Sequence, residues 1–474
     1  MTATMGARNM EQEQVAGPGK ETPEAKKKRL LQSLEVFRTK SFASTGKGDC
    51  VSEFPSFDAV DGIKFDFCEG ARILFPDEGS GWLVRILDAD SDIPVYVTEV
   101  APSSYVVTAY KWFVRYKIVI YAKADADRAV RMQYLDKMDY ATALSQIKPV
   151  FEHEMSLEDK VVMFNLGSSA IGDTLAWFPK IAEFQEKHKC KAVAAIGESF
   201  IPLLEKQYPN VTILSKAHVR AWCDEHRAEI YAAYVLALFP GKTPNRYWEP
   251  CDFRLVGLAP AVAHILGVDP TPAKAKLDLS ADRTIREPYV CIAAQGGSMT
   301  KMWLNRSGWD DVVQFLKAAG YRVICIDRNR TEGNGVFSHS IPFGCEDFTG
   351  RRPLQERIDV LKDADFFIGT SSGLSWLAWS CNIPVVLISG FTHPSNEFHT
   401  PYRVINYNGC NSCFNNQDFV FDNTDYEWCP VFKGTPRQFE CSRNISGKMV
   451  IAAIQRIPGY QRHVAALGKM HSQP

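Results

Sequence analysis

Apolar residues are grouped in short runs along the first part of the chain. Between about residues 54 and 122 these runs contain β-branched and aromatic residues and are separated by turn residues such as those at 77–81. This pattern is typical of a small antiparallel sheet or barrel, and we expect a separate all-β domain over 41–125. The preceding residues 1–40 are polar and basic and predict a disordered tail. Residues 126–157 predict a helical connector.

Farther along the chain, short apolar runs alternate with helical periodicity. In 158–285 the strand candidates are 161–164, 192–196, 211–214 and 234–239. A second series in 286–460 has strand candidates at 289–294, 322–327, 366–369, 384–388 and 403–407. Strands alternating with helices predict parallel sheets, and two such series predict two Rossmann-like domains that face a cleft. The expected fold is therefore α/β, with a small all-β domain in front.

Composition narrows the class of protein. The formal net charge of −1 offers no general attraction to nucleic acid. No apolar run approaches the roughly 18 residues that span a bilayer, and Glu11 and Glu13 interrupt any signal-peptide core. We therefore expect no transmembrane segment and no export. Thirteen cysteines in such a chain indicate thiols or metal ligands more than a disulfide framework.

One glycine-bearing turn has unusual chemistry. The first strand candidate of 158–285 is followed by N-L-G-S-S-A-I-G-D-T-L-A-W, in which Gly167 and Gly172 have the spacing of a phosphate-binding P-loop. Asp173 occupies the position of the P-loop lysine, and Thr174 that of the magnesium-binding hydroxyl. A carboxylate there repels phosphate but can accept a proton, so Asp173 is a candidate base. The neighbouring hydroxyl of Thr174 is a candidate contact for a donor substrate. The alternative is that Asp173 is only a helix N-cap.

Three strand ends in 286–460 indicate a nucleotide-linked ligand. Gly296 and Gly297 allow close backbone approach, and Lys301 supplies a positive charge for a diphosphate. Asp327 ends the next strand, where a carboxylate can accept hydrogen bonds from ribose hydroxyls. The third strand end precedes a helix N-terminus, an anion site formed by Ser371, Ser372 and Gly373.

Four cysteines have the spacing of a metal site. Cys410, Cys413, Cys429 and Cys441 form C-x2-C-x15-C-x11-C within 408–443. Four thiolates complete a closed, structural site for one metal ion, and spacing alone does not separate zinc from iron. Disulfides or free thiols are the alternative.

The motifs G-D-T-L-A-W, K-M-W-L-N and G-T-S-S-G-L-S-W-L-A-W resemble those of bacterial heptosyltransferases of the GT-B glycosyltransferase fold. The closer resemblance is to the TibC-type autotransporter heptosyltransferases, and it covers about residues 50–460. It implies an inverting transfer from ADP-heptose to serine residues of an adhesin passenger in the bacterial cytoplasm. It further implies that Asp173 is the base, that Lys301 binds the donor diphosphate, that the metal is iron, and that protomers form a ring-like dodecamer. Lipopolysaccharide heptosyltransferases carry an acid, a threonine and a histidine where this chain has Ser371, Ser372 and Trp376.

Two other functions are compatible with parts of this sequence. A nucleotide-sugar transferase with a lipid or small-molecule acceptor would explain the strand ends, but not the β domain and the cysteine loop. A non-enzymatic metal-ribbon protein that binds nucleic acid would explain the cysteines. The neutral net charge and the few basic residues near the loop count against it.

Overall fold

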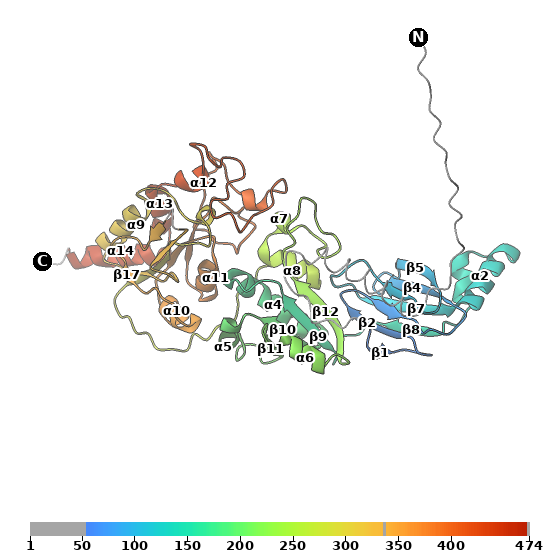
Figure 1. The fold of residues 1–474 in the computed structure, drawn as a ribbon. Coiled ribbons are helices and arrows are strands. Elements are labelled where there is room, and N and C mark those ends of the chain that lie inside the picture. The colour runs from blue at the N-terminus through green and yellow to red at the C-terminus, as the bar shows by residue number, and fades with distance from the viewer. Residues whose placement is uncertain (1–53, 335–337, 472–474) are drawn as a thin grey trace, which may run out of the picture. The chain divides into compact units, whose positions relative to one another are not determined.

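The computed structural model describes residues 54–334 and 338–471 of the chain (Figure 1). The disordered tail expected at 1–40 lies outside the described residues, as does the beginning of the expected β domain. Among the described helices, none combines the length and the apolar character needed to cross a membrane.

A four-stranded antiparallel sheet with the order β5-β4-β7-β8 lies near the beginning of the described chain. Its strands are β4 (Trp82–Asp88), β5 (Pro94–Val100), β7 (Tyr116–Ala122) and β8 (Phe151–Glu154). Helices α2 (Lys123–Leu135) and α3 (Tyr140–Ser145) cover one face, where alternate residues Leu83, Leu87, Val119 and Tyr121 are buried (Figure 1). The helical connector was expected over 126–157. Its first helix, α2, begins before residue 126, and the segment also contains β8, which pairs with β7.

The first Rossmann-like sheet has four parallel strands in the order β11-β10-β9-β12. These are β9 (Val161–Leu166), β10 (Lys191–Ile196), β11 (Val211–Ser215) and β12 (Ile230–Leu236). Their helices are α4 (Ile171–His188), η1 (Glu198–Phe200), α5 (Ile201–Leu204), α6 (Val219–Glu225), α7 (Phe253–Val256) and α8 (Leu258–Leu266). Every residue of β12 is buried, as expected for a parallel strand covered on both faces. Strand β12 begins before the range 234–239 that the sequence predicted.

This sheet continues into the strands of the β domain, so the two share one set of backbone hydrogen bonds. Strand β2 (Lys64–Cys68) pairs in parallel with β12, in the register Ala232 to Phe67. The strands that extend the sheet in antiparallel fashion are β1 (Phe57–Asp58), β3 (Arg72–Leu74) and β6 (Tyr105–Val107). Asp66 and Arg72 form a buried ion pair across β2 and β3, with 2.5 Å between Oδ2 and Nη2. Pairing with β2 satisfies the edge of β12 that would otherwise be open.

The second Rossmann-like sheet has six parallel strands in the order β17-β14-β13-β18-β19-β20. They are β13 (Tyr289–Ala293), β14 (Arg322–Cys325), β17 (Glu346–Asp347), β18 (Phe367–Thr370), β19 (Val385–Ile388) and β20 (Arg403–Val404). A small hairpin is formed by β15 (Thr331–Gly333) and β16 (Ser338–Ser340). The five predicted strands are all present, several of them shorter than their apolar runs.

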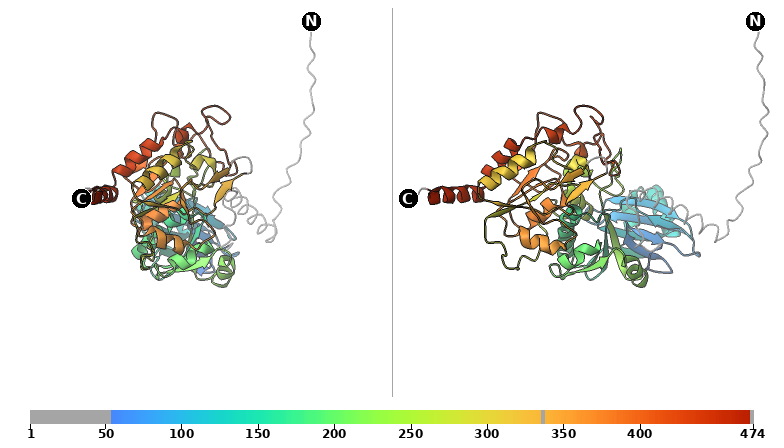
Figure 2. Two further views of the ribbon diagram at one scale, coloured as in Figure 1. Left: turned by 90° about the vertical axis from the view of Figure 1, so that its left-hand side faces the viewer. Right: turned by 60° about the vertical axis from the view of Figure 1, so that its left-hand side comes forward.

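Helices cover the second sheet and build its core. They are η2 (Met299–Lys301), α9 (Gly308–Ala318), α10 (Leu354–Leu361), α11 (Gly373–Ser380), η3 (Cys413–Asn415), α12 (Glu440–Arg443), α13 (Gly447–Gln455) and α14 (Pro458–His471). Figure 2 shows the red helix α13 beside the yellow helix α9. Val312, Leu316, Val450 and Ile454 of these two helices lie in one buried cluster with the strands. The packing leaves the carboxyl ends of the strands to the loops that carry the polar motifs.

Candidate active site

Asp173 lies in the first turn of α4, directly after the loop that follows β9. The N-cap of this helix is Ala170, so the alternative of Asp173 as an N-cap does not describe the structure. Gly167 is required for close packing, because a Cβ there would lie 2.8 Å from the Cβ of Ala237. Thr174 is fully buried, and its hydroxyl donates to the carbonyl oxygen of Ala170 at 3.0 Å. The contact of Thr174 with the donor stays a prediction, and in the structure its hydroxyl is engaged by this backbone carbonyl.

The environment of Asp173 favours a carboxylate that can take up a proton. Burial raises its pKa above the ordinary aspartate value, while a hydrogen bond with Ser168 and the charges of Lys301 and Lys216 act in the opposite direction. Lys216 directly follows β11 and donates from Nζ to the carbonyl oxygen of Ser168 at 3.0 Å. The structure thus brings Lys301, which the sequence places far from Asp173, within electrostatic range of it.

Asp327 shapes the loop that leads to Lys301. The residue is 2% exposed, and its carboxylate accepts hydrogen bonds from the backbone N–H groups of Ala294 at 2.9 Å and Gln295 at 3.3 Å. These bonds direct the carboxylate into the loop, whereas we expected it to meet ribose hydroxyls. A Cβ on Gly296 would lie 2.8 Å from the Cβ of Lys301, so the turn requires glycine there. Gly297 has open space around it, as a ligand contact would need.

Lys301 is the last residue of η2 and supplies the positive charge that was predicted to bind a diphosphate. Its Nζ lies 5.8 Å from the ring centroid of Phe391 and 5.4 Å from that of Phe421. Burial lowers the pKa of Lys301, and the charges of Asp173 and Glu397 oppose this shift. The ammonium group is thus partly withdrawn from water and lies within electrostatic range of two carboxylates, so a phosphate could replace them as its partner.

The N-termini of α4 and α11 lie against each other. A Cβ on Gly373 would come within 2.5 Å of the Cβ of Ile171 and 2.8 Å of the backbone nitrogen of Gly172. A Cβ on Gly172 would lie 3.3 Å from Cδ1 of Trp376, so this tryptophan packs against the turn. Two glycines therefore allow two helix N-termini, each with unpaired N–H groups, to meet at one place.

Two serines complete the turn before α11. Ser372 is the N-cap, and its buried Oγ has no hydrogen-bond partner among the described residues. Ser371 Oγ hydrogen-bonds to Thr392 Oγ1 at 2.7 Å and also to Glu397. Glu397 in turn pairs with Arg403, with 2.7 Å between Oε2 and Nη2. An unsatisfied hydroxyl at a helix N-terminus is a natural donor to an anion or a sugar hydroxyl.

Sequence reasoning missed Lys216, Glu397 and the two rings at Lys301. Lys216 was detectable, because it follows β11 at the same carboxyl edge as the loop after β9. Glu397 lies well beyond the end of β19, and no spacing rule relates it to Ser371. Phe391 and Phe421 had no signal in the sequence, since aromatic residues in loops are ordinarily read as packing.

The four cysteines of the predicted metal loop line one cavity. Its volume is about 10 Å³, enough for about one water-sized particle. None of the four forms a disulfide. Burial raises the pKa of Cys413 to about 12, with further contributions from the charges of Cys410 and Cys429, so a thiolate there needs a cation. Across the described ranges, however, no group of three or more His, Cys, Asp or Glu residues is arranged to hold a metal, so the expected ligand set is not formed.

Comparison with known proteins identifies two domains within the chain. Residues 60–124 match the family described as "Glycosyltransferase TibC, N-terminal domain", and residues 258–420 match "Glycosyltransferase family 9 (heptosyltransferase)". The chain is 44% identical over 409 residues to the autotransporter heptosyltransferase Aah of Escherichia coli, covering 86% of this chain and 96% of that protein. It is 42% identical over 405 residues to the autotransporter heptosyltransferase BAHTCr of Citrobacter rodentium, covering 85% and 91%.

A solved structure has the same fold. It is described as a dodecameric iron-containing heptosyltransferase, TibC, in complex with ADP-D-beta-D-heptose. It matches with a TM-score of 0.77 and 39% identity, covering 87% of this chain and 99% of that one. The expected GT-B-like fold with a small N-terminal domain of strands is thereby confirmed, and so is a glycosyltransferase activity in place of a nucleic-acid-binding ribbon. The identity across nearly the full length of these relatives shows that the chain belongs to the autotransporter heptosyltransferases.

Proposed function

We propose that this chain transfers heptose from ADP-heptose to serine hydroxyls of an autotransporter passenger protein, with inversion at the anomeric carbon. Membership in the family supports the transfer reaction. The TibC structure, described as a complex with ADP-D-beta-D-heptose, supports the donor. The names of the relatives support an autotransporter acceptor.

The observation that carries this proposal is that Asp173 and Lys301, which belong to the two different Rossmann-like domains, are close enough for the charge of each to act on the pKa of the other. The two opposite charges influence each other where the N-termini of α4 and α11 meet. In the proposed step Asp173 accepts the proton of the serine hydroxyl as its oxygen forms a bond to the anomeric carbon. The bond from that carbon to the β-phosphate oxygen breaks, and its electron pair leaves with ADP. Attack from the face opposite to ADP inverts the carbon.

The leaving ADP is stabilised on the other side of the reacting carbon. We assign this task to Lys301 and to the N–H groups at Gly373, with Ser371 and Ser372 beside them, because an ammonium group and a helix N-terminus both favour developing phosphate charge. Gly296 and Gly297 let the backbone approach the nucleotide. Asp327 serves as the residue that holds this loop in shape.

We propose that one structural metal ion per chain is held by Cys410, Cys413, Cys429 and Cys441. The residues fit the group in kind, since four thiols line one small cavity, although they are not drawn into a ligand set. The iron content in the description of TibC favours iron over zinc. Four thiolates leave no coordination position for substrate, so the ion would stabilise the loop and take no part in transfer.

Metal analysis of protein purified without oxygen tests this site. We expect about one metal equivalent per chain, retained by Cys291→Ser in β13 and lost in the double variant Cys410→Ser with Cys413→Ser. Less than about half an equivalent in the wild-type chain would contradict the proposal.

We also propose that the protomers assemble into a dodecamer and act in the bacterial cytoplasm. The dodecameric description of TibC supports the assembly, and the resemblance to its family supports the location. Sedimentation of the full-length chain would measure the assembly, and a monomer at working concentration would contradict it.

Intact-mass analysis of a passenger protein tests the reaction itself. The purified chain with ADP-heptose and an autotransporter passenger should add heptose units, and peptide mapping should place them on serines. Passenger incubated with the Asp173→Asn chain is the control. No mass increase with the wild-type chain would overturn the proposed function, and modification of other residues would overturn the acceptor.

A further inference from the structure

The ammonium group of Lys301 lies against two aromatic rings that come from different segments. Phe391 follows β19, and Phe421 belongs to the four-cysteine loop 408–443. Both centroids are within 6 Å of Nζ, at 5.8 Å and 5.4 Å, the range in which a ring face attracts a cation. These contacts bring part of the metal loop to the donor side of the active site.

The two rings are held in place by a packed aromatic cluster. Phe421 contacts Phe391 at 5.3 Å between centroids and Trp428 at 5.1 Å, the latter with the planes at 89°. Phe391 and Trp428 are buried together with Cys413, one of the four cysteines. Edge-to-face pairs of this kind restrict ring orientation. The position of Phe421 therefore depends on how the cysteine loop is packed.

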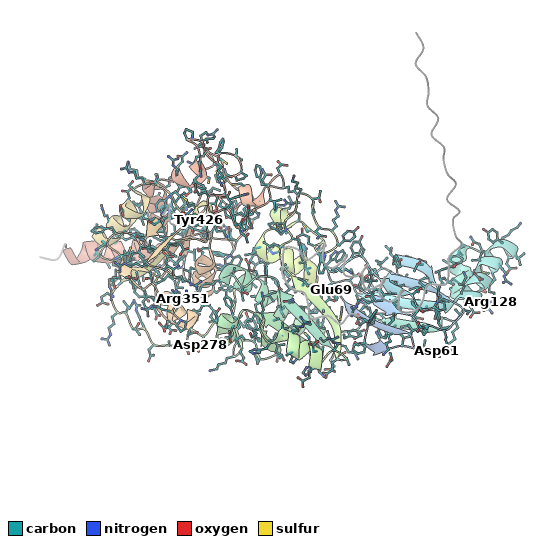
Figure 3. The ribbon with its side chains drawn as sticks, viewed as in Figure 1. Asp61, Glu69, Arg128, Asp278, Arg351 and Tyr426 are labelled. Atoms are coloured by element: carbon teal, nitrogen blue, oxygen red, sulfur yellow. The ribbon has the colours of Figure 1, made fainter. Side chains whose placement is uncertain are left out.

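The loop also holds the backbone beside Lys301. The N–H of Met299 donates to the carbonyl oxygen of Tyr426 at 2.9 Å, and Tyr426, labelled in Figure 3, lies between Phe421 and Cys429 in sequence. The side chain of Met299 packs with Cys429 and Phe439. Thr300 lines the same cavity as the four cysteines. The turn that carries Lys301 is thus held by the loop through both backbone and side chains.

We propose that Phe421 is a positioning residue for donor binding, and that its ring holds the Lys301 ammonium group where it meets the donor diphosphate. Lysine is a point charge on a flexible four-carbon stem, so it gains affinity for a phosphate only if something restricts the stem. Asp173 is a competing partner, and an ion pair with it would remove the lysine from the donor and neutralise the base. The rings oppose both losses. The inference rests on the proposed role of Lys301 in binding the donor.

The test is the affinity of the full-length chain for ADP, measured by calorimetry. Phe421→Leu keeps an apolar side chain and removes the ring, and we expect it to weaken ADP binding about 2- to 30-fold. Phe421→Tyr and Phe421→Trp keep a ring and should restore most of the affinity. Phe414→Leu is the matched control, because Phe414 packs in the same cluster with its ring centroid 5.6 Å from that of Phe421. Among the described residues, the rings that lie against the Lys301 ammonium group are those of Phe391 and Phe421. It should bind ADP nearly as the wild-type chain does.

Several outcomes would overturn the inference. Equal losses in Phe421→Leu and Phe414→Leu would show that only packing matters, and unchanged affinity in Phe421→Leu would show that the ring has no effect. Lys301→Met separates this inference from the proposed function. If it loses ADP affinity while Phe421→Leu does not, the positioning role alone fails. If it binds ADP like the wild-type chain, or if the wild-type chain does not bind ADP, the assigned donor site fails and the inference with it.

Discussion

The loop after β9 and the loop after β13 have the same order of strand, glycine-bearing loop and helical turn, but they carry opposite charges. Each follows a buried parallel strand, contains glycine and ends in a helical turn that carries a charged side chain, Asp173 in one and Lys301 in the other. Burial shifts both pKa values toward the neutral form, and each group opposes the shift of the other. The difference in charge assigns the two loops to different partners: a hydroxyl that gives up a proton, and a phosphate.

The two loops also differ in how they are held. Asp173 is fixed locally, by the first turn of α4 and by the nearby Ser168. The ammonium group of Lys301 lies against the rings of Phe391 and Phe421, and the turn that carries it is held by the bond from Met299 to Tyr426. These three aromatic residues are all more than 80 residues away from Lys301 in sequence. The carboxylate therefore depends on secondary structure, whereas the ammonium group depends on long-range packing. Three substitutions test this comparison.

The largest effect is expected from removing the charge of the first loop. Asp173→Asn keeps the size of the side chain and removes the proton acceptor, so heptose transfer should fall by about 10²- to 10⁴-fold. ADP affinity should be retained, because the positive partner of the diphosphate is unchanged. Transfer is measured by passenger mass and ADP affinity by calorimetry. Full transfer activity in this variant would reduce Asp173 to a structural residue.

An intermediate effect is expected from separating the two helix N-termini. Gly373→Ala places a Cβ within 2.5 Å of the Cβ of Ile171, so the helices must shift or tolerate strain. Overpacking of this kind costs about 1–3 kcal/mol of unfolding free energy, and transfer should fall with it.

Thermal or denaturant unfolding measures this loss. Gly468→Ala in α14 is the control, since a Cβ there meets nothing within 4 Å and alanine favours a helix by up to about 1 kcal/mol. A Gly373→Ala chain as stable and as active as the wild type would show that the close approach is not needed.

The smallest effect is expected from the lysine beside the first loop. The positive charge of Lys216 lowers the pKa of Asp173, so Lys216→Met should raise that pKa further. Asp173 acts as a base only when ionised; activity is therefore lost as the pH falls through its pKa. The acid limb of the pH–rate profile should move to higher pH, with the rate above it unchanged. Lys206→Met, an exposed lysine, is the control. An unmoved acid limb would contradict the assignment of Asp173 as the titrating base.

Much of the fold was predictable because it depends on local patterns. The strand candidates at 161–164, 192–196 and 211–214 correspond to β9, β10 and β11, since continuous apolar runs between helices are typical of parallel strands. The pairing of β2 with β12 was not predictable, because strand partners across more than 150 residues have no signature in either strand. The continuation of the first Rossmann-like sheet into the strands of the β domain is therefore a finding of the structure alone.

In the candidate site, too, the positions of residues along the chain were predictable from the sequence, but their surroundings were not. Asp173, Lys301 and Gly373 were predicted from strand ends and glycines, and Thr174 and Asp327 were predicted to contact the donor from their positions after a glycine and at a strand end. In the structure both are buried and bonded to backbone groups. Burial depends on what other segments cover a residue, and the residue's own type does not reveal that.

By itself, then, the sequence determined where charged groups and glycines follow buried strands, because hydrophobic periodicity and turn chemistry act over a few residues. It also determined which loop is anionic and which is cationic. Only the tertiary structure decided that the turns at Gly172 and Gly373 touch and that the charge of Lys301 lowers the pKa of Asp173. It also decided that Phe421 of the cysteine loop lies against the Lys301 ammonium group. These are contacts between segments that are distant in sequence, and they exist because burying the surrounding apolar surface brings those segments together.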